Sequence, residues 1–186
     1  MINLQKKQSI NLVKAAPSLT NIRVGLSWDQ VAINGQSPDC DVSVFLLDQN
    51  SKIPGEQYLV FYNNLVSGDG AVRHSGDNRS GAGEGDDEVI DINLSAVSPS
   101  ILQMIFTISI NNSAAGFNFS TVTNASVRVY NSANNQIICQ YKLAESFPNS
   151  DTLNIGRCYR NGQEWEFEAM GQDYSGGLEV ALSLYS

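Results

Sequence analysis

Hydrophobic and polar residues alternate with a period of two along most of the chain, as in β-strands that bury one face. Ile22, Val24 and Leu26 show the alternation clearly, whereas Tyr58–Tyr62 is a continuous apolar run of the kind found in buried strands. The segments that these patterns predict as strands are Ile10–Leu12, Ile22–Leu26, Val42–Leu46, Tyr58–Tyr62, Val89–Leu94, Leu102–Ile110, Ala125–Tyr130, Gln136–Leu143, Leu153–Tyr159 and Trp165–Met170.

Turn-forming residues separate the predicted strands, and Asn161-Gly162 in particular predicts a tight hairpin. Helix signals are few: Ser95–Leu102 and Phe119–Thr123 could each hold a short helical turn, and the closing GGLEVALSLY fits a strand or a short helix. Many short strands with regularly spaced turns predict an all-β fold. We expect a β-sandwich of two mainly antiparallel sheets with long acidic loops and one or two short helices, forming a single domain over residues 1–186.

Composition narrows the classes of partner. The chain has 186 residues, a formal net charge of -8 and a sequence pI near 4.5, so it lacks the basic surface that nucleic acids require. Three widely spaced cysteines, Cys40, Cys139 and Cys158, form no CxxC pair and indicate reduced structural thiols. The N-terminus has no signal-peptide core and no apolar run reaches membrane-spanning length, so we expect a cytoplasmic protein without stable membrane insertion.

The most informative segment is Gly76–Glu88, GDNRSGAGEGDDE, in which carboxylates alternate with glycines around a single arginine. Crowded like charges repel one another unless a cation lies among them, and glycines allow a loop to aim several oxygens at one point. Asp29 ends one predicted strand, and Asp39 and Asp41 project together before another. A solvated acidic loop is the simplest alternative, but this second acidic group favours a hard cation, Ca²⁺ rather than Mg²⁺.

The predicted metal ligands come from the loop and from these strand ends. They are Asp29, Asp39, Asp41, Asp77, Asn78, Gly83, Glu84, Asp86, Asp87 and Glu88, for one or two Ca²⁺ ions. The twelve residues Asp77–Glu88 do not form an EF-hand, because Arg79, Gly81 and Ala82 replace required residues and no flanking helices are predicted.

Nothing specific in the sequence indicates catalysis, and we predict no catalytic residues and no enzymatic activity. His74 is the only histidine, and its neighbours Ser75 and Asp77 do not make a triad, which assembles from separated segments. We interpret His74 as a surface residue or a hydrogen-bonding residue at a strand end. Cys40 lies between two carboxylates, which should raise the pKa of its thiol and weaken it as a nucleophile.

Several motifs together resemble the TerD domain, the family of tellurite-resistance and bacterial stress proteins whose relatives include calcium-binding proteins. The similarity runs from about Ser9 to Leu178 and is carried by GLSWD, DCDVSVFLLDQNSKI and the FYNN…GDN…GEGDDE series. It implies a β-sandwich with acidic Ca²⁺-binding loops, and the family's acidic positions correspond to the predicted ligands above. Ser27, Cys40 and Ser75 depart from the common family residues, and none of these changes removes an oxygen ligand.

The resulting hypothesis is a non-enzymatic, calcium-binding module of stress response or tellurite resistance. In it, Ca²⁺ orders the acidic loop and thereby gates docking to a partner protein, for which the resemblance suggests other resistance proteins, some of them at the membrane. Two alternatives remain at this point: Ca²⁺-dependent binding to anionic membranes, and a metal-dependent phosphoester hydrolase.

Overall fold

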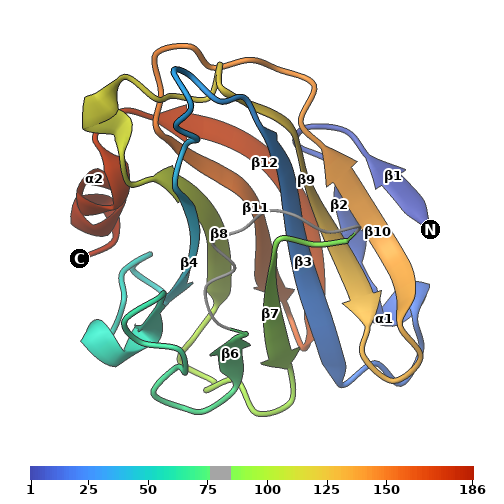
Figure 1. Cartoon of the computed structure of the whole chain (residues 1–186). Helices are drawn as coiled ribbons and strands as arrows, with labels where there is room; N and C mark the ends of the chain where they lie inside the picture. The colour runs from blue at the N-terminus through green and yellow to red at the C-terminus, as the bar shows by residue number, and fades with distance from the viewer. Residues whose placement is uncertain (76–84) are drawn as a thin grey trace.

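The computed structural model places two six-stranded β-sheets face to face, and it describes residues 1–75 and 85–186 (Figure 1). In sheet A the strands lie in the order β1 (Ile2–Leu4), β10 (Gln136–Lys142), β9 (Val122–Asn131), β3 (Asn21–Gln30), β7 (Glu88–Asn93) and β6 (Val72–His74). In sheet B the order is β2 (Ser9–Asn11), β12 (Glu164–Tyr174), β11 (Thr152–Asn161), β8 (Gln103–Ile110), β4 (Cys40–Leu47) and β5 (Leu59–Val60).

All described strand pairs are antiparallel except β1 with β10, so the predicted sandwich of mainly antiparallel sheets is confirmed. The described helical elements are short: α1 (Leu12–Ala15), α2 (Gly177–Tyr185) and the 3₁₀ turns η1 (Glu56–Tyr58) and η2 (Ser113–Ala115). None of the helices in residues 1–75 and 85–186 has the length and apolar character needed to cross a bilayer.

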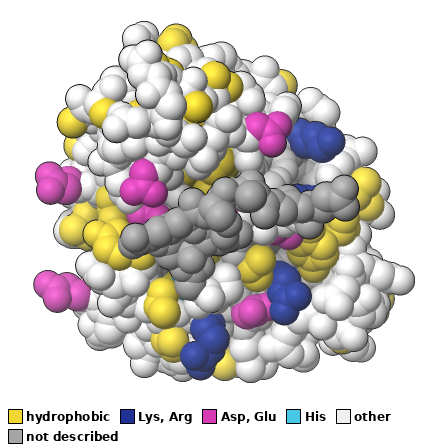
Figure 2. Space-filling model, in the orientation of Figure 1, with side chains coloured by type: hydrophobic (Ala, Val, Ile, Leu, Met, Phe, Trp, Pro, Cys, Tyr) yellow, Lys and Arg dark blue, Asp and Glu magenta, His cyan; other side chains and the backbone are white. Residues whose placement is uncertain are grey.

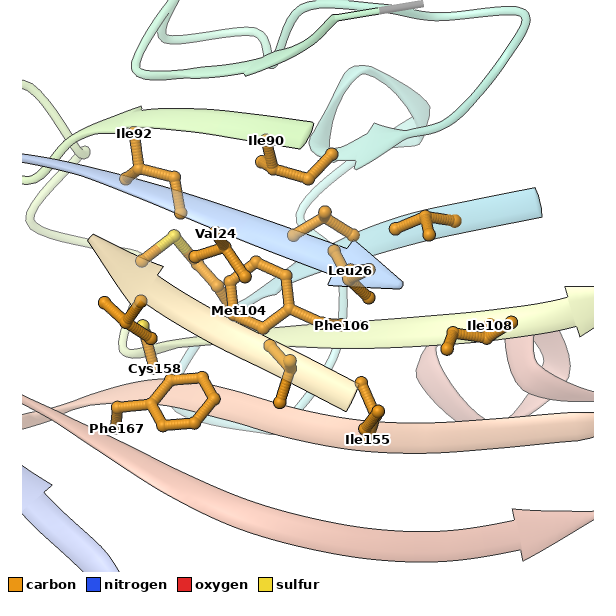
Figure 3. Close-up of a cluster of buried hydrophobic side chains, with 14 of the residues drawn as sticks. Val24, Leu26, Ile90, Ile92, Met104, Phe106, Ile108, Ile155, Cys158 and Phe167 are labelled. Atoms are coloured by element: carbon orange, nitrogen blue, oxygen red, sulfur yellow. The ribbon is translucent and has the colours of Figure 1, made fainter. Parts of the chain in front are cut away.

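The core lies between the sheets and is made by the alternating residues that the sequence pattern singled out (Figure 3). Val24 and Leu26 of sheet A face Phe106 and Ile108 of sheet B, and all four side chains are fully buried. Burying a side chain of this size stabilises the fold by about 1.5–3 kcal/mol. The alternation therefore decides which side chains of each strand point into the core and which point outward.

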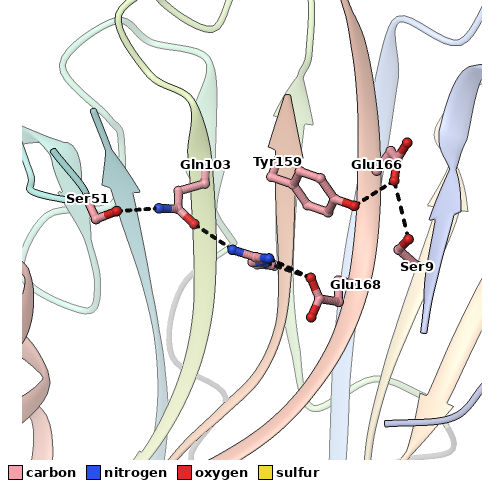
Figure 4. Close-up of polar contacts among 7 residues, drawn as sticks. Ser9, Ser51, Gln103, Tyr159, Glu166 and Glu168 are labelled. Carbon is pink, nitrogen blue, oxygen red and sulfur yellow. Dashed lines mark hydrogen bonds and ion pairs between the residues drawn. The ribbon is translucent and has the colours of Figure 1, made fainter. Parts of the chain in front are cut away.

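The outer face of sheet B has two different halves. One half is polar, with a ladder that joins Ser51, Gln103, Arg157 and Glu168 across three strands (Figure 4); Arg157 Nη2 lies 2.7 Å from Glu168 Oε2. The other half is apolar and is covered by α2, whose buried Ala181 packs with Phe45 and Ile105.

The tight hairpin and most of the strands form as predicted, with small shifts at their ends. Asn161 pairs with Glu164, so the turn residues are Gly162 and Gln163, and Gly162 has a φ of +64°. A positive φ at the first central residue is the glycine position of a type II′ turn. The sequence prediction had placed Asn161 in the turn, whereas it is the last residue of β11.

Three local predictions are wrong. Tyr58–Tyr62 is not one buried strand, because Tyr58 ends η1, only Leu59–Val60 pair with β4, and the chain then turns at Phe61–Asn64. Ser95–Leu102 and Phe119–Thr123 hold turns and the start of β9 rather than helical turns. In both places an asparagine side chain closes a local turn: Asn93 Oδ1 accepts from the N–H groups of Ser95 and Ala96, and Asn118 Oδ1 accepts from the N–H of Ser120.

Candidate functional site

Carboxylates from three strand ends meet at one end of the sandwich. Glu88 begins β7 and pairs in register with Leu26 of β3, which places Asp87 beside the end of β3, where Asp29 lies. Asp41 lies at the start of β4 in the opposite sheet, and Asp39 directly precedes that strand. Asp29, Asp39, Asp41, Asp87 and Glu88 therefore lie at the same end of the sandwich.

Glu88 connects the two sheets at this end. Its Oε2 accepts a hydrogen bond from the backbone N–H of Val42 in sheet B at 3.0 Å and lies 2.9 Å from His74 Nε2 in sheet A. Glu88 and His74 are only 2% and 4% exposed, so the pair belongs to the interior rather than to the surface. Burial raises the pKa of Glu88, and its hydrogen bonds to His74 and Val42 oppose that rise. Glu88 therefore acts here as a structural acceptor. His74 is a hydrogen-bonding residue at the end of β6, as one of its two predicted roles has it, and the alternative surface role is wrong because the side chain is buried.

Asp87 is held at the rim by backbone contacts. Its Oδ2 accepts from the N–H of Trp28 at 2.7 Å, and its own N–H donates to the carbonyl of Leu26 at 2.7 Å. Burial raises the pKa of the Asp87 carboxyl, the Trp28 hydrogen bond lowers it, and the nearby carboxylates of Asp29 and Asp86 raise it further. The positive charge of Arg128 opposes the rise, and a cation added beside Asp87 would oppose it further.

Asp86 points onto the outer face of sheet A, where the side chains of β9 hold it. Its Oδ1 lies 2.7 Å from Arg128 Nη2, and its Oδ2 accepts from the hydroxyl of Tyr130 at 2.8 Å. The side chain lies directly over Gly25 of β3, and a Cβ added at Gly25 would come within 3.0 Å of three carboxyl atoms of Asp86. Burial and the Asp86 carboxylate raise the pKa of Tyr130 to about 12, so its hydroxyl stays protonated and donates.

Asp39 and Asp41 are tied to the loop that follows β8. The side-chain amide of Asn111 donates to Asp41, and the backbone N–H of Asn111 donates to the carbonyl of Asp39 at 2.8 Å. Between these two carboxylates, Cys40 faces the core, and its thiol pKa is raised first by burial and then by Asp39, Asp41, Glu88 and Asp87. The predicted effect of flanking carboxylates on Cys40 is confirmed, although burial is the larger cause.

A pocket of about 340 Å³ opens at this end, on the outer side of sheet A. Asp29, Asp87 and Asn124 line it, and Asn124 Nδ2 donates to Asp29 Oδ2 at 2.6 Å. Arg128 and Lys142 line it as well. The pocket therefore offers carboxylate and amide oxygens, the donor type that Ca²⁺ prefers, together with two positively charged side chains.

The described residues do not form a complete cation site by themselves. Within residues 1–75 and 85–186, no three His, Cys, Asp or Glu side chains are grouped closely enough to hold a metal ion. Four of the predicted ligands, Asp77, Asn78, Gly83 and Glu84, lie outside the described residues. The structure thus brings Asp29 together with Asp87, and Asp41 with Glu88, and it holds Asp86 against Arg128; the ligand set as a whole stays a prediction.

Sequence reasoning missed the residues that position these carboxylates. Arg128 and Tyr130 alternate with core residues on a predicted strand, so their outward direction was readable, but the loop that they hold was not. Asn111 and Asn124 lie in or beside strands that the pattern predicted, and nothing in their spacing marks them as partners of Asp41 and Asp29.

Fold and site together define a β-sandwich protein with a cluster of carboxylates where strands from both sheets end. The sequence model of the TerD domain family matches residues 1–185 of this chain, and the chain belongs to this family. It is 41% identical over 185 residues to "Tellurium resistance protein TerD" of Serratia marcescens, covering 99% of this chain and 96% of that protein. It is 44% identical over 179 residues to "General stress protein 16U" of Bacillus subtilis, covering 95% and 93% of the two chains.

Solved structures agree with the fold. A crystal structure described as a homologue of telluride resistance protein (TerD) from Streptomyces coelicolor A3(2) superposes with a TM-score of 0.69 at 20% identity, covering 91% of this chain and 99% of that one. At this identity the likeness supports the fold alone. The relatives are named for resistance and stress rather than for an enzymatic activity.

Proposed function

We propose that this TerD-family protein is a calcium-binding, non-enzymatic module of bacterial stress or tellurite resistance, and that it acts in the cytoplasm. The observation that carries the calcium proposal is Asp87, a partly buried carboxyl whose pKa is raised, next to Asp29 in a pocket lined by oxygen donors. A hard divalent cation would offset the repulsion between these two carboxylates. Asp29, Asp87 and Asn124 are the described residues that we propose to contact or approach it.

Binding of Ca²⁺ would also change the surface that this end of the sandwich presents. The bound cation would make the net charge of this surface less negative, and we propose that this change controls docking of a partner protein. Ordering of the Gly76–Glu88 loop by the ion is part of the same proposal, and most of that loop lies outside the described residues. Relatives named for tellurium resistance and for general stress support the physiological setting.

Thermal unfolding with and without Ca²⁺ tests the proposal. A ligand that binds only the folded chain stabilises it by about 2.7 kcal/mol when its free concentration is a hundred times its Kd. We expect Ca²⁺ to raise the Tm of the chelator-treated chain and Mg²⁺ to raise it less. The double variant Asp29→Asn/Asp87→Asn should lose most of the gain.

Asp91→Asn is the matched control, because Asp91 lies on β7 but pairs with Arg23, and it is 45% exposed. This variant should keep the full response to Ca²⁺. A gain in Tm of equal size in the double variant and in the parent would show that Asp29 and Asp87 do not hold the ion.

Calcium-dependent binding to an anionic membrane is a second candidate with one observation in its favour. The loop over residues 31–38 joins Asp29 and Asp39, and it exposes Val31 and Ile33 to 49% and 43%. Apolar side chains beside a cation site could insert into the interfacial region while the cation contacts lipid phosphate. Co-sedimentation with phosphatidylserine vesicles in Ca²⁺, lost in Val31→Ser/Ile33→Ser, would favour this candidate, and the absence of Ca²⁺-dependent sedimentation would remove it.

A further inference from the structure

A groove on the opposite side of sheet B from the core runs between α2 and the β5 region. It consists of two adjoining pockets of about 480 and 370 Å³ that share Leu59, Phe61 and Leu182. We call it the α2 groove, and its further apolar lining comes from Tyr62, Ile110, Leu178 and Ile53. One end of the groove adjoins the carboxylate cluster at Asn111, which lines the larger pocket and donates to Asp41 and Asp39. None of the predicted metal ligands among the described residues lines the groove, so the inference drawn from it does not depend on the proposed cation site.

Both walls of the α2 groove are fixed by hydrogen bonds. Asp151 Oδ1 accepts from the N–H groups of Gly176 and Gly177 at 2.9 and 2.8 Å, which holds the start of α2. The end of α2 is held where the N–H of Ile53 donates to the carbonyl of Tyr185 at 2.8 Å. The facing wall is a tight turn in which Phe61 and Asn64 exchange two backbone hydrogen bonds. A binding surface with rigid walls costs little conformational entropy to occupy.

The groove exposes apolar side chains that nothing in the described chain covers. Tyr62 is 47% exposed. Phe61 and Leu182 pack against the second core cluster but remain partly exposed. Figure 2 shows hydrophobic side chains near the left margin of this face, over the region where Figure 1 draws α2 and η1. A contiguous apolar surface of this kind with a polar rim commonly marks an interaction site.

Charge identifies the chemistry of the occupant. The charged residues that line the two pockets are Asp151, Glu56 and Glu179, all acidic, and no Lys or Arg lines either pocket in the described part of the chain. Asp151 is engaged with α2, whereas Glu56 and Glu179 are exposed. In Figure 2 the Lys and Arg side chains in view lie away from this patch, and carboxylates flank it. A partner segment with basic residues beside its apolar ones complements this rim.

We propose that the α2 groove binds a basic amphipathic helix of a partner protein. Addition of a β-strand is disfavoured, because the edge strand β5 has only two residues before the chain turns back at Phe61–Asn64, which is too short for a ladder. Two adjoining apolar pockets instead suit side chains that project from one face of a helix at i and i+4 or i+7. Glu56 and Glu179 then face the Lys or Arg residues on the flanks of the helix.

The test uses a fluorescently labelled synthetic helix of about 18 residues with a leucine face and a lysine face, and a matched helix in which glutamate replaces lysine. Binding is measured by fluorescence anisotropy in EDTA, so that the outcome is independent of any cation. The groove variants are Tyr62→Ser and the charge reversal Glu56→Lys/Glu179→Lys, which all change exposed side chains. The charge-matched control is Glu145→Lys/Glu164→Lys, which lies outside the groove.

We expect saturable binding of the lysine helix, weakened about tenfold or more by each groove variant and less than about twofold by the control. The glutamate helix should not bind. Equal loss in the groove and control variants would mean attraction by net charge alone and would overturn the proposal. Concentration-dependent dimerisation of the free chain, detected by sedimentation equilibrium and abolished by Tyr62→Ser, would overturn it in favour of a second copy as the occupant.

Discussion

The contact between Gly25 and Asp86 gives the sharpest stability prediction. In Gly25→Ala, the new methyl group would overlap the Asp86 carboxyl, so Asp86 must leave Arg128 and Tyr130. A hydrogen bond to a charged group contributes about 1.5–3 kcal/mol, a partly exposed ion pair up to about 1 kcal/mol, and Gly→Ala returns about 0.4–1 kcal/mol through the unfolded chain. The net loss is about 2 kcal/mol, which lowers the Tm of a chain of this size by about 4–8 °C.

A double-mutant cycle in EDTA isolates the cause. Asp86→Ala removes the carboxyl group that Gly25 accommodates, so adding Gly25→Ala to that background should be neutral or slightly stabilising. Thermal melts followed by circular dichroism give all four stabilities. If Gly25→Ala costs as much without Asp86 as with it, the alanine disturbs the strand in some other way, and our account of how Asp86 is held is wrong.

Two further predictions concern other buried or capping groups. His74→Ala should lower the free energy of unfolding, measured in urea, by about 3–5 kcal/mol, because it leaves the buried Glu88 carboxylate without its ring partner. Glu88→Gln keeps an acceptor and should cost less. A loss of stability below about 1 kcal/mol in His74→Ala would contradict the pairing. Burial raises the pKa of the Asp151 carboxyl, but the N–H groups of Gly177 and Gly176 outweigh this and hold that pKa below its ordinary 3.8. The ionised Asp151 therefore stabilises the fold above pH 3.8, and this contribution is lost as the pH falls through the folded-state pKa. Asp151→Ala should therefore cost about 1 kcal/mol at pH 7 and progressively less below pH 3.8, and a cost that does not change with pH would refute this role.

Strands were predictable where one face is buried and the other is not. The alternation in Ile22–Leu26 or Ala125–Tyr130 follows directly from the pleat, so the pattern alone located β3 and β9. Tyr58–Tyr62 failed because a continuous apolar run has no period: Leu59 and Val60 are buried in a short pair with β4, while Tyr62 is exposed at the α2 groove. The three-residue strands β1 and β6 are too short to carry a pattern.

The C-terminal segment shows how tertiary packing decides an ambiguous pattern. Leu178, Ala181, Leu182 and Tyr185 are spaced i, i+3, i+4 and i+7, and all of them pack on the second core cluster, which selects the helix. The residues alone were equally compatible with a strand. Only the apolar half of the outer face of sheet B, with Phe45 and Ile105, supplies the surface that a helix can cover.

For the candidate site, the sequence predicted the acidic residues but not their partners. Asp29, Asp39 and Asp41 were proposed as ligands because carboxylates at strand ends stand out in the pattern. The roles of Glu88 and Asp86 were not readable, since they depend on Val42, His74 and Arg128, which reach them only through sheet pairing. The spacing of residues along the sequence does not show which strand face lies under which loop, because sheet pairing decides that.

Isothermal titration calorimetry of the chelator-treated chain with Ca²⁺ tests the central claim most directly. The account predicts saturable binding that is weakened about tenfold or more by Asp29→Asn/Asp87→Asn and is retained in Asp91→Asn, with Mg²⁺ binding more weakly. The account would be contradicted if the folded chain showed no saturable binding of Ca²⁺ at millimolar concentrations.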